Sequence, residues 1–171
     1  MTSKTTLLIP ILEEILVKEI GEANIPILNW KQTSPFKYKF LADIGKYTEV
    51  VTVDFDLFDE VGKEYYISPK YHHLKDLYNV GYMVSGEQFQ FAKSDMKTLL
   101  TILSTIVDII KDFISKNEID GLFILGTPKS SDNPDNSTKN NIHKAFIQKQ
   151  LNQISNYILD THRDGLILIK K

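Results

Sequence analysis

Two aspartates in one predicted strand are the residues whose types and spacing come nearest to catalytic or metal chemistry. Asp54 and Asp56 lie two positions apart in the segment VDFDLFDE, so their side chains share one strand face, roughly 7 Å apart. Carboxylates at that distance could bind a cation or hold a general base. No histidine or second carboxylate motif completes such a site, and the spacing is not that of a calcium loop. We therefore favour a solvated sheet face.

Neighbouring histidines, His72 and His73, form the densest cluster of possible metal ligands. Adjacent side chains diverge in an extended chain, so such a pair rarely binds one metal, and His143 and His162 are distant in sequence. The chain has no cysteine, which excludes disulfides, thiolate catalysis and cysteine zinc sites. No GxSxG motif activates Ser85. We therefore predict a loop role for the histidines, no metal site and no catalytic residue.

The start of a long helix, within AKSDMKTLLTILSTIVDIIKDFISKNEIDGLFILG (residues 92–126), is the third candidate site. Free N–H groups and the helix dipole favour an anion there. However, Ser94 is a good N-cap, Asp95 already supplies an anion, and no glycine allows a close backbone approach. Arg163 is the only arginine, although arginine is the preferred phosphate clamp. A self-capped helix is therefore favoured over a ligand site.

Composition indicates one ordinary globular domain. The 171 residues are 42% hydrophobic and 25% charged, with a net charge of -2, so no broad nucleic-acid surface is expected. No apolar run reaches the ~18 residues of a membrane span, and we predict no targeting segment. The abundance of Lys, Ile and Asn beside a single arginine fits an AT-rich gene.

Hydrophobic periodicity predicts an α+β domain with a mixed sheet. An N-terminal helix and extended arm occupy residues 1–30, and a single domain occupies residues 31–171. The predicted elements are a helix over 7–21, a hairpin over 36–58, a strand or loop over 64–68, a strand over 77–86 that continues past a bulge at Gly86, a helix over 95–116, a buried strand over 120–126, a loop over 127–139, a helix over 140–158 and a C-terminal strand after the turn at 160–165.

The helix over 95–116 is expected at the centre of the core, because its apolar arc is too wide for a surface helix. It joins two strands that could pair in parallel as a crossover. The preceding part of the chain is rich in tyrosine, which suits either a packed sheet or a protein interface. These tyrosines are Tyr65, Tyr66, Tyr71, Tyr78 and Tyr82.

The run ILSTIVDIIKDFI followed by IDGLFILG, with a strand-rich part before it and a loop, helix and strand after it, resembles a group of uncharacterised tailed-phage proteins. Those look like degenerate relatives of GNAT-type N-acetyltransferases, and the resemblance covers about residues 36–170 in order of elements. It implies a central strand splayed from its neighbour, with acetyl-CoA in the gap and its pyrophosphate at the start of the long helix.

By position, the resemblance makes Ser94, Asp95, Met96, Lys97 and Thr98 the cofactor-binding residues. The tyrosine that often serves as the acid in that family would be Tyr157, near the end of the predicted helix over 140–158. The family's basic or glutamine residue followed by spaced glycines is missing here.

We therefore expect a non-enzymatic structural or protein-interaction protein, encoded by a phage, with a virion component among the roles that it would suit. Its partners would be other protein subunits, virion proteins or itself, in the host cytoplasm or the virion, without direct contact to nucleic acid or membrane. The alternative is an acyl-CoA-dependent N-acetyltransferase of GNAT type with acetyl-CoA as cofactor. A third, weaker option is an inhibitor that binds a host protein through the acidic hairpin around Asp54.

Overall fold

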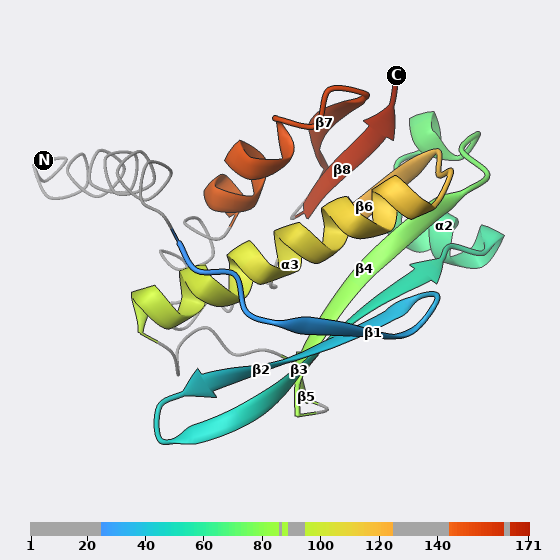
Figure 1. Ribbon diagram of the computed structural model, residues 1–171. Coiled ribbons are helices and arrows are strands. Elements are labelled where there is room, and N and C mark those ends of the chain that lie inside the picture. The colour runs from blue at the N-terminus through green and yellow to red at the C-terminus, as the bar shows by residue number, and fades with distance from the viewer. Residues whose placement is uncertain (1–24, 86, 89–94, 125–143, 163–164) are drawn as a thin grey trace, which may run out of the picture.

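A mixed β-sheet with the strand order β1-β2-β3-β4-β6-β8-β7 forms the centre of the protein (Figure 1). The computed structural model describes residues 25–85, 87–88, 95–124, 144–162 and 165–171. The strands are β1 (Trp30–Ser34), β2 (Lys37–Ile44), β3 (Tyr47–Leu57), β4 (Leu77–Val84), β5 (Glu87–Gln88), β6 (Gly121–Ile124), β7 (Tyr157–His162) and β8 (Gly165–Lys170). The predicted α+β class with a mixed sheet is confirmed.

The parallel pair β4 and β6 is joined by α3 (Met96–Lys116), as the crossover prediction required. Their register runs from Leu77 opposite Gly121 to Val80 opposite Ile124. On its other side, β4 pairs with β3 from Tyr78 to Val84. The other neighbouring strands along the described sheet are antiparallel.

One face of the sheet is covered by α3, which crosses in front of it in Figure 1. Its buried side chains occupy most of the helix circumference, which explains the wide apolar arc in the sequence. The helical residues 144–151 add Phe146, Ile147 and Leu151 to the same core. Removing these apolar surfaces from water is the main stabilising contribution, because burial of one such side chain is worth about 1.5–3 kcal/mol.

Among the described residues, the opposite face is covered only in part, by residues 58–76. This covering segment contains α2 (Glu60–Tyr66) and the short 3-10 helix η1 (Pro69–Tyr71). It packs on the strands β4, β6 and β8 through a second apolar cluster, made of Ile67, Tyr71, Leu74, Leu77, Phe123 and Ile167. All the residues of β6 are consequently buried. We call β6 and β8 the doubly covered half of the sheet.

The strands β1, β2 and β3 form the open half of the sheet, because no helix in the described ranges packs on their second face. Along β2, Tyr38, Phe40 and Ala42 are buried beneath α3, whereas the alternate residues are exposed. This period of two is the pattern of a strand with one wet face. The hairpin predicted over 36–58, with one solvated face, is confirmed, and its turn contains Gly45 at φ +64°.

The covering segment begins differently from its prediction, because residues 64–68 belong mostly to α2 instead of a strand or loop. Asp59 caps this helix, and its Oδ1 accepts a hydrogen bond from the Gly62 N–H at 2.7 Å. The aromatic and β-branched residues Tyr65, Tyr66 and Ile67 favour strands, but the cap and the burial of Ile67 decide the local structure.

Two further predicted boundaries were wrong. The chain does not continue β4 past a bulge at Gly86. Instead β5 turns back on β4, with Val84 opposite Glu87, after Ser85 adopts φ 47°. The helix predicted over 140–158 is helical to residue 151 in the described residues, and β7 follows it. The predicted helix over 7–21 and the loop over 127–139 lie outside the described residues.

Candidate functional site

The start of α3 holds a carboxylate of the protein itself. Asp95 is the N-cap, and its Oδ1 accepts a hydrogen bond from the Thr98 N–H at 2.7 Å. The predicted cap at Ser94 was therefore wrong, and Ser94 lies outside the described residues. The bond from Thr98 lowers the pKa of Asp95, which keeps its carboxylate charged. A pyrophosphate at this helix end would face that charge, so Asp95, Met96, Lys97 and Thr98 do not fit an anionic cofactor well.

Tyr157 lies at the start of β7 and not near the end of a helix as predicted. Burial raises the pKa of its phenol, and the charges of Asp120 and Glu118 raise it further. The side chain packs partly against the main apolar core. Its surroundings therefore differ from those that the N-acetyltransferase alternative assumed for a tyrosine acid.

Asp54 and Asp56 lie on the exposed face of the open half of the sheet. Lys37, directly opposite Asp54 on β2, forms an ion pair with it at 3.2 Å. This is the arrangement of a solvated sheet face. Across the described ranges, no group of His, Asp and Glu side chains is placed to hold a metal ion.

Two histidines, His72 and His162, contact backbone atoms of the covering segment. The Nε2 of His72 lies 2.9 Å from the Ile67 carbonyl oxygen. His162, which is buried, has its Nε2 3.2 Å from both the Ser68 nitrogen and the Tyr66 oxygen. His72 and His162 therefore hold the turn after α2 in place, and the loop role predicted for His72 agrees with this contact.

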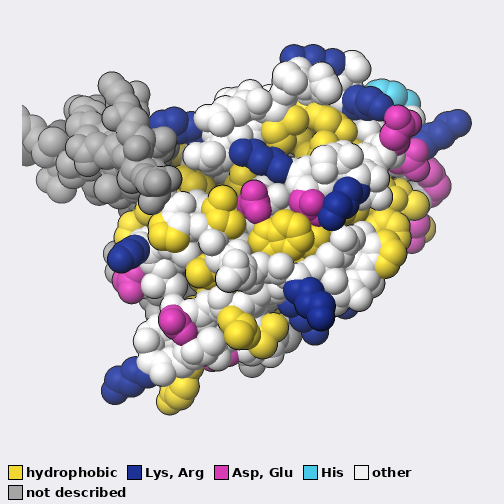
Figure 2. All heavy atoms as spheres, viewed as in Figure 1, with side chains coloured by type: hydrophobic (Ala, Val, Ile, Leu, Met, Phe, Trp, Pro, Cys, Tyr) yellow, Lys and Arg dark blue, Asp and Glu magenta, His cyan; other side chains and the backbone are white. Residues whose placement is uncertain are grey.

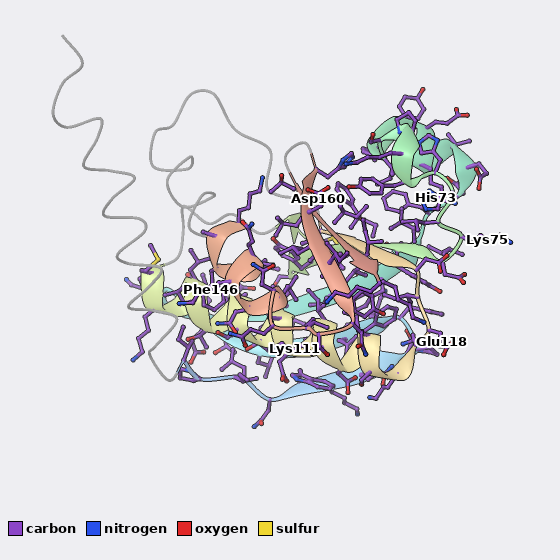
Figure 3. All side chains as sticks on the ribbon, turned by 90° about the horizontal axis from the view of Figure 1, so that it is seen from above. His73, Lys75, Lys111, Glu118, Phe146 and Asp160 are labelled. Carbon is purple, nitrogen blue, oxygen red and sulfur yellow. The ribbon has the colours of Figure 1, made fainter. Side chains whose placement is uncertain are left out.

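A polar cluster that the sequence did not reveal joins η1 to the edge strand β7. Tyr71 donates a hydrogen bond to Asp160 at 2.5 Å, and the Nζ of Lys70 lies 3.3 Å from the same oxygen. Asp160 is labelled on its strand in Figure 3. The bonds from Tyr71 and Lys70 lower the pKa of Asp160, whereas burial raises that of Tyr71. A charged carboxylate beside a protonated phenol makes a stable link and a poor proton-transfer pair at neutral pH.

Polar contacts also fasten the first described residues to α3. The Leu28 N–H donates to Thr105 Oγ1 at 3.0 Å, and the Trp30 indole N–H donates to Asp108 at 2.8 Å. The Tyr38 hydroxyl lies 3.1 Å from Asp112. The arm from residue 25 to residue 30 thus packs on its own domain, and the strand β1 already begins at Trp30.

The tyrosine-rich region divides into buried and exposed parts. Tyr71 is only 6% exposed, but Tyr65 is 73% exposed and Val61, one helical turn before it, is 60% exposed. Glu60 and Glu64 flank them on the same side of α2, since residues four apart lie on one helix face. We call these four residues, Glu60, Val61, Glu64 and Tyr65, the α2 outer stripe.

The α2 outer stripe is the candidate binding site of the described chain. Figure 2 shows acidic side chains along the edge of the molecule where α2 lies in Figure 1. The sequence signal was present in the alternation of Glu60 and Glu64 with Val61 and Tyr65, together with the cap residue Asp59. It was missed because the prediction treated this stretch as a strand or loop.

Comparison of the chain with protein-family models, curated proteins and solved structures found no match. No helix in the described part of the chain has the length and apolar character of a bilayer span.

Proposed function

We propose that this chain is a non-enzymatic protein-interaction domain that binds another protein through the α2 outer stripe. The observation that supports it most is the exposure of Val61 and Tyr65 on one face of a short helix. Tyrosine is enriched in protein interfaces because it offers a large apolar ring and a polar hydroxyl. An exposed aromatic and an aliphatic side chain flanked by carboxylates match the usual anatomy of a binding surface with a polar rim.

The stripe is presented by a helix that is held at both ends. Asp59 caps the start of α2, and Phe58 packs partly against the second apolar cluster. After the helix, Ile67 is 1% exposed and the Tyr66 carbonyl lies beside His162. A surface that is ordered before binding loses less conformational entropy when the partner arrives.

We propose a phage protein, in the host cytoplasm or the virion, as the setting of this function. The resemblance to tailed-phage proteins and the lysine-rich, arginine-poor composition support that setting. The partners would then be virion proteins, other subunits or a second copy of the chain.

Site-specific photo-cross-linking tests the proposed interaction. The full chain would carry p-benzoylphenylalanine in place of Tyr65, or in place of the exposed Glu118 in the loop after α3 as a control (Figure 3). We expect a discrete protein adduct from position 65 in cells of the native host, and its loss when Val61→Asp is added. No adduct, or the same adducts from position 118, would contradict the proposal.

A second candidate is an acyl-CoA-dependent N-acetyltransferase of GNAT type, because the strand topology favours it. The crossover helix α3 joins β4 and β6, which pair in parallel from Leu77 opposite Gly121 to Val80 opposite Ile124 within the described residues. The resemblance implied such a central strand pair. The carboxylate of Asp95 opposes this candidate, so we place it second.

Thermal denaturation with acetyl-CoA separates the two candidates. A binder gains about 2.7 kcal/mol of stability at one hundred times its dissociation constant. Lys97→Glu, which adds negative charge to the first turn of α3, should reduce that gain if the cofactor binds there. An unchanged melting temperature at millimolar acetyl-CoA would remove this candidate.

A further inference from the structure

We propose that the α2 outer stripe docks on the open sheet face of a second copy of this chain. This inference rests on the proposed interaction function and names its partner. The acceptor surface, which we call the sheet patch, consists of Lys31, Lys39, Leu41, Val50 and Met83 on the strands β1 to β4. Its residues face away from α3, because their neighbours along each strand point into the main core.

The sheet patch contains a contiguous apolar surface. Leu41 and Val50 are directly opposite each other on β2 and β3, and they are 60% and 38% exposed. Met83 on β4 is 39% exposed and lies opposite Thr52 on β3, so it is diagonal to Val50. Side chains at such positions on one face touch or nearly touch. An apolar row of this kind gains stability when another apolar surface covers it.

The same patch holds two lysines on neighbouring strands. Lys31 and Lys39 are directly opposite on β1 and β2, and both are exposed. Neither forms an ion pair with a residue that the structure describes. Lys37 on β2, by contrast, forms an ion pair with Asp54 on β3. Like charges directly opposite in a sheet repel each other, so the pair favours a partner that brings carboxylates.

The α2 outer stripe brings charges of the opposite sign beside apolar groups. Glu60 and Glu64 lie one helical turn apart, next to Val61 and Tyr65. Glu60 has an ion pair with Lys63 at 3.3 Å, but the side chain of Lys63 is only 4% exposed whereas that of Glu60 is 87% exposed. The acidic row can thus face the lysines while Val61 and Tyr65 cover the apolar row.

The mass of the assembly distinguishes the two ways in which this contact can repeat. If each copy offers its stripe to the other, the pair closes as a two-fold dimer. If each copy binds the next one head to tail, the contact produces longer assemblies. Both use the same residues, so the same variants test them.

Sedimentation velocity of the full chain over a range of concentrations provides the test. We expect the wild type to associate, and salt to weaken the association. The double variant Glu60→Lys, Glu64→Lys makes both contact surfaces positive, and Lys31→Glu, Lys39→Glu makes both negative. Each alone should associate at least about tenfold more weakly, since facing like charges are unfavourable.

An equimolar mixture of the two double variants is the decisive sample. Each stripe in the mixture faces a patch of opposite sign on the other variant, so association should return to near the wild-type affinity. The control Lys111→Glu, Lys149→Glu makes the same change of charge on the helices at the opposite side of the sheet, and should leave association unchanged. The substituted side chains are exposed or half-buried, but Glu60→Lys also removes the ion-pair partner of the buried Lys63. Circular dichroism therefore checks the folding of each variant, and Glu64→Lys alone, which leaves that ion pair intact, should weaken association in the same direction.

Three results would overturn the inference: a wild type that stays monomeric, a mixture that does not recover, or a control that associates as weakly as the test variants. The cross-linking at position 65 then shows whether the proposed function fails too. An adduct with a different protein would retain the interaction function and reject the second copy as partner. The absence of any adduct would reject both.

Discussion

The doubly covered half and the open half of the sheet use opposite sequence patterns for the same backbone geometry. Strands β6 and β8 are continuous apolar runs, GLFI and GLILIK, because α3 with the helical residues 144–151 covers one face and the covering segment covers the other. Strands β2 and β3 alternate, because only one of their faces is buried. The doubly covered half therefore contributes more buried apolar surface per residue to stability, while the open half retains a surface available for binding.

Truncating one apolar side chain in each half should show this difference in stability most strongly. Phe123 in β6 is 2% exposed and its ring packs near Phe58 and His162. We expect Phe123→Ala to lower the free energy of unfolding by about 3–5 kcal/mol. Leu41→Ala in the open half, at a side chain 60% exposed, should change it by less than about 0.5 kcal/mol. Urea denaturation measures both, and similar losses would break the comparison.

Two glycines should give the next largest contrast. A Cβ on Gly165 in β8 would lie 2.5 Å from the Ile124 carbonyl oxygen, whereas one on Gly81 in β4 would have no atom within 4 Å. Gly165→Ala should therefore cost about 3 kcal/mol through overpacking. Gly81→Ala should be neutral or slightly stabilising. Equal melting temperatures for the two variants would show that the covered half is less tightly packed than described.

Alkaline titration should show how the inner face of the open half is anchored. Burial, with a hydrogen bond to Asp112 and its charge, raises the pKa of Tyr38 from 10.0 to about 12. The unfolded chain loses this proton first, so the contribution of Tyr38 to stability is complete below pH 10 and falls as the pH rises to 12. We expect a loss of about 2 kcal/mol from this group.

Tyr38→Phe isolates this loss from that of the other tyrosines. The variant lacks the phenol, so its unfolding free energy should fall less steeply between pH 10 and pH 12 than that of the wild type. Parallel pH profiles of the two proteins would mean that Tyr38 does not titrate as its surroundings predict.

The smallest effect is expected on the exposed face. Lys31→Glu converts the cross-strand repulsion with Lys39 into an attraction, and should raise the unfolding free energy by about 0.5 kcal/mol. Thermal denaturation at a concentration where the chain is monomeric measures the gain. Lys46→Glu in the turn after β2 makes the same change in charge away from that pair, and an equal gain there would argue for a net-charge effect only.

The elements that were predicted correctly have strong local periodicity. Apolar and polar residues alternate clearly in the hairpin of β2 and β3, α3 has a long apolar arc, and β6 is a short apolar run that begins at Gly121. In each of them, the hydrophobic pattern and the final burial agree. Local sequence is then sufficient to specify the element.

The elements that were missed depend on contacts between distant residues. Ile154 and Ile158 continue the helical spacing of Ile147 and Leu151, but Ile158 instead lies opposite Ile169 in the ladder between β7 and β8. Pairing with β8 outweighs the local helical pattern there. The site was harder still, because the exposed stripe exists only if residues 60–66 are helical. The bond from Tyr71 to Asp160 spans 89 positions in sequence.

The position of Trp30 makes it an intrinsic fluorescence reporter. It is the chain's single tryptophan, its indole N–H binds Asp108 on α3, and its ring lies edge-on to Tyr38 at 5.4 Å. Intrinsic emission excited in the tryptophan band therefore comes from one place, the junction of the edge strand with the central helix. Emission should shift to the red when β1 detaches and its indole becomes hydrated. Its neighbour Lys31 belongs to the sheet patch, so docking of another chain should also change this signal without any added dye.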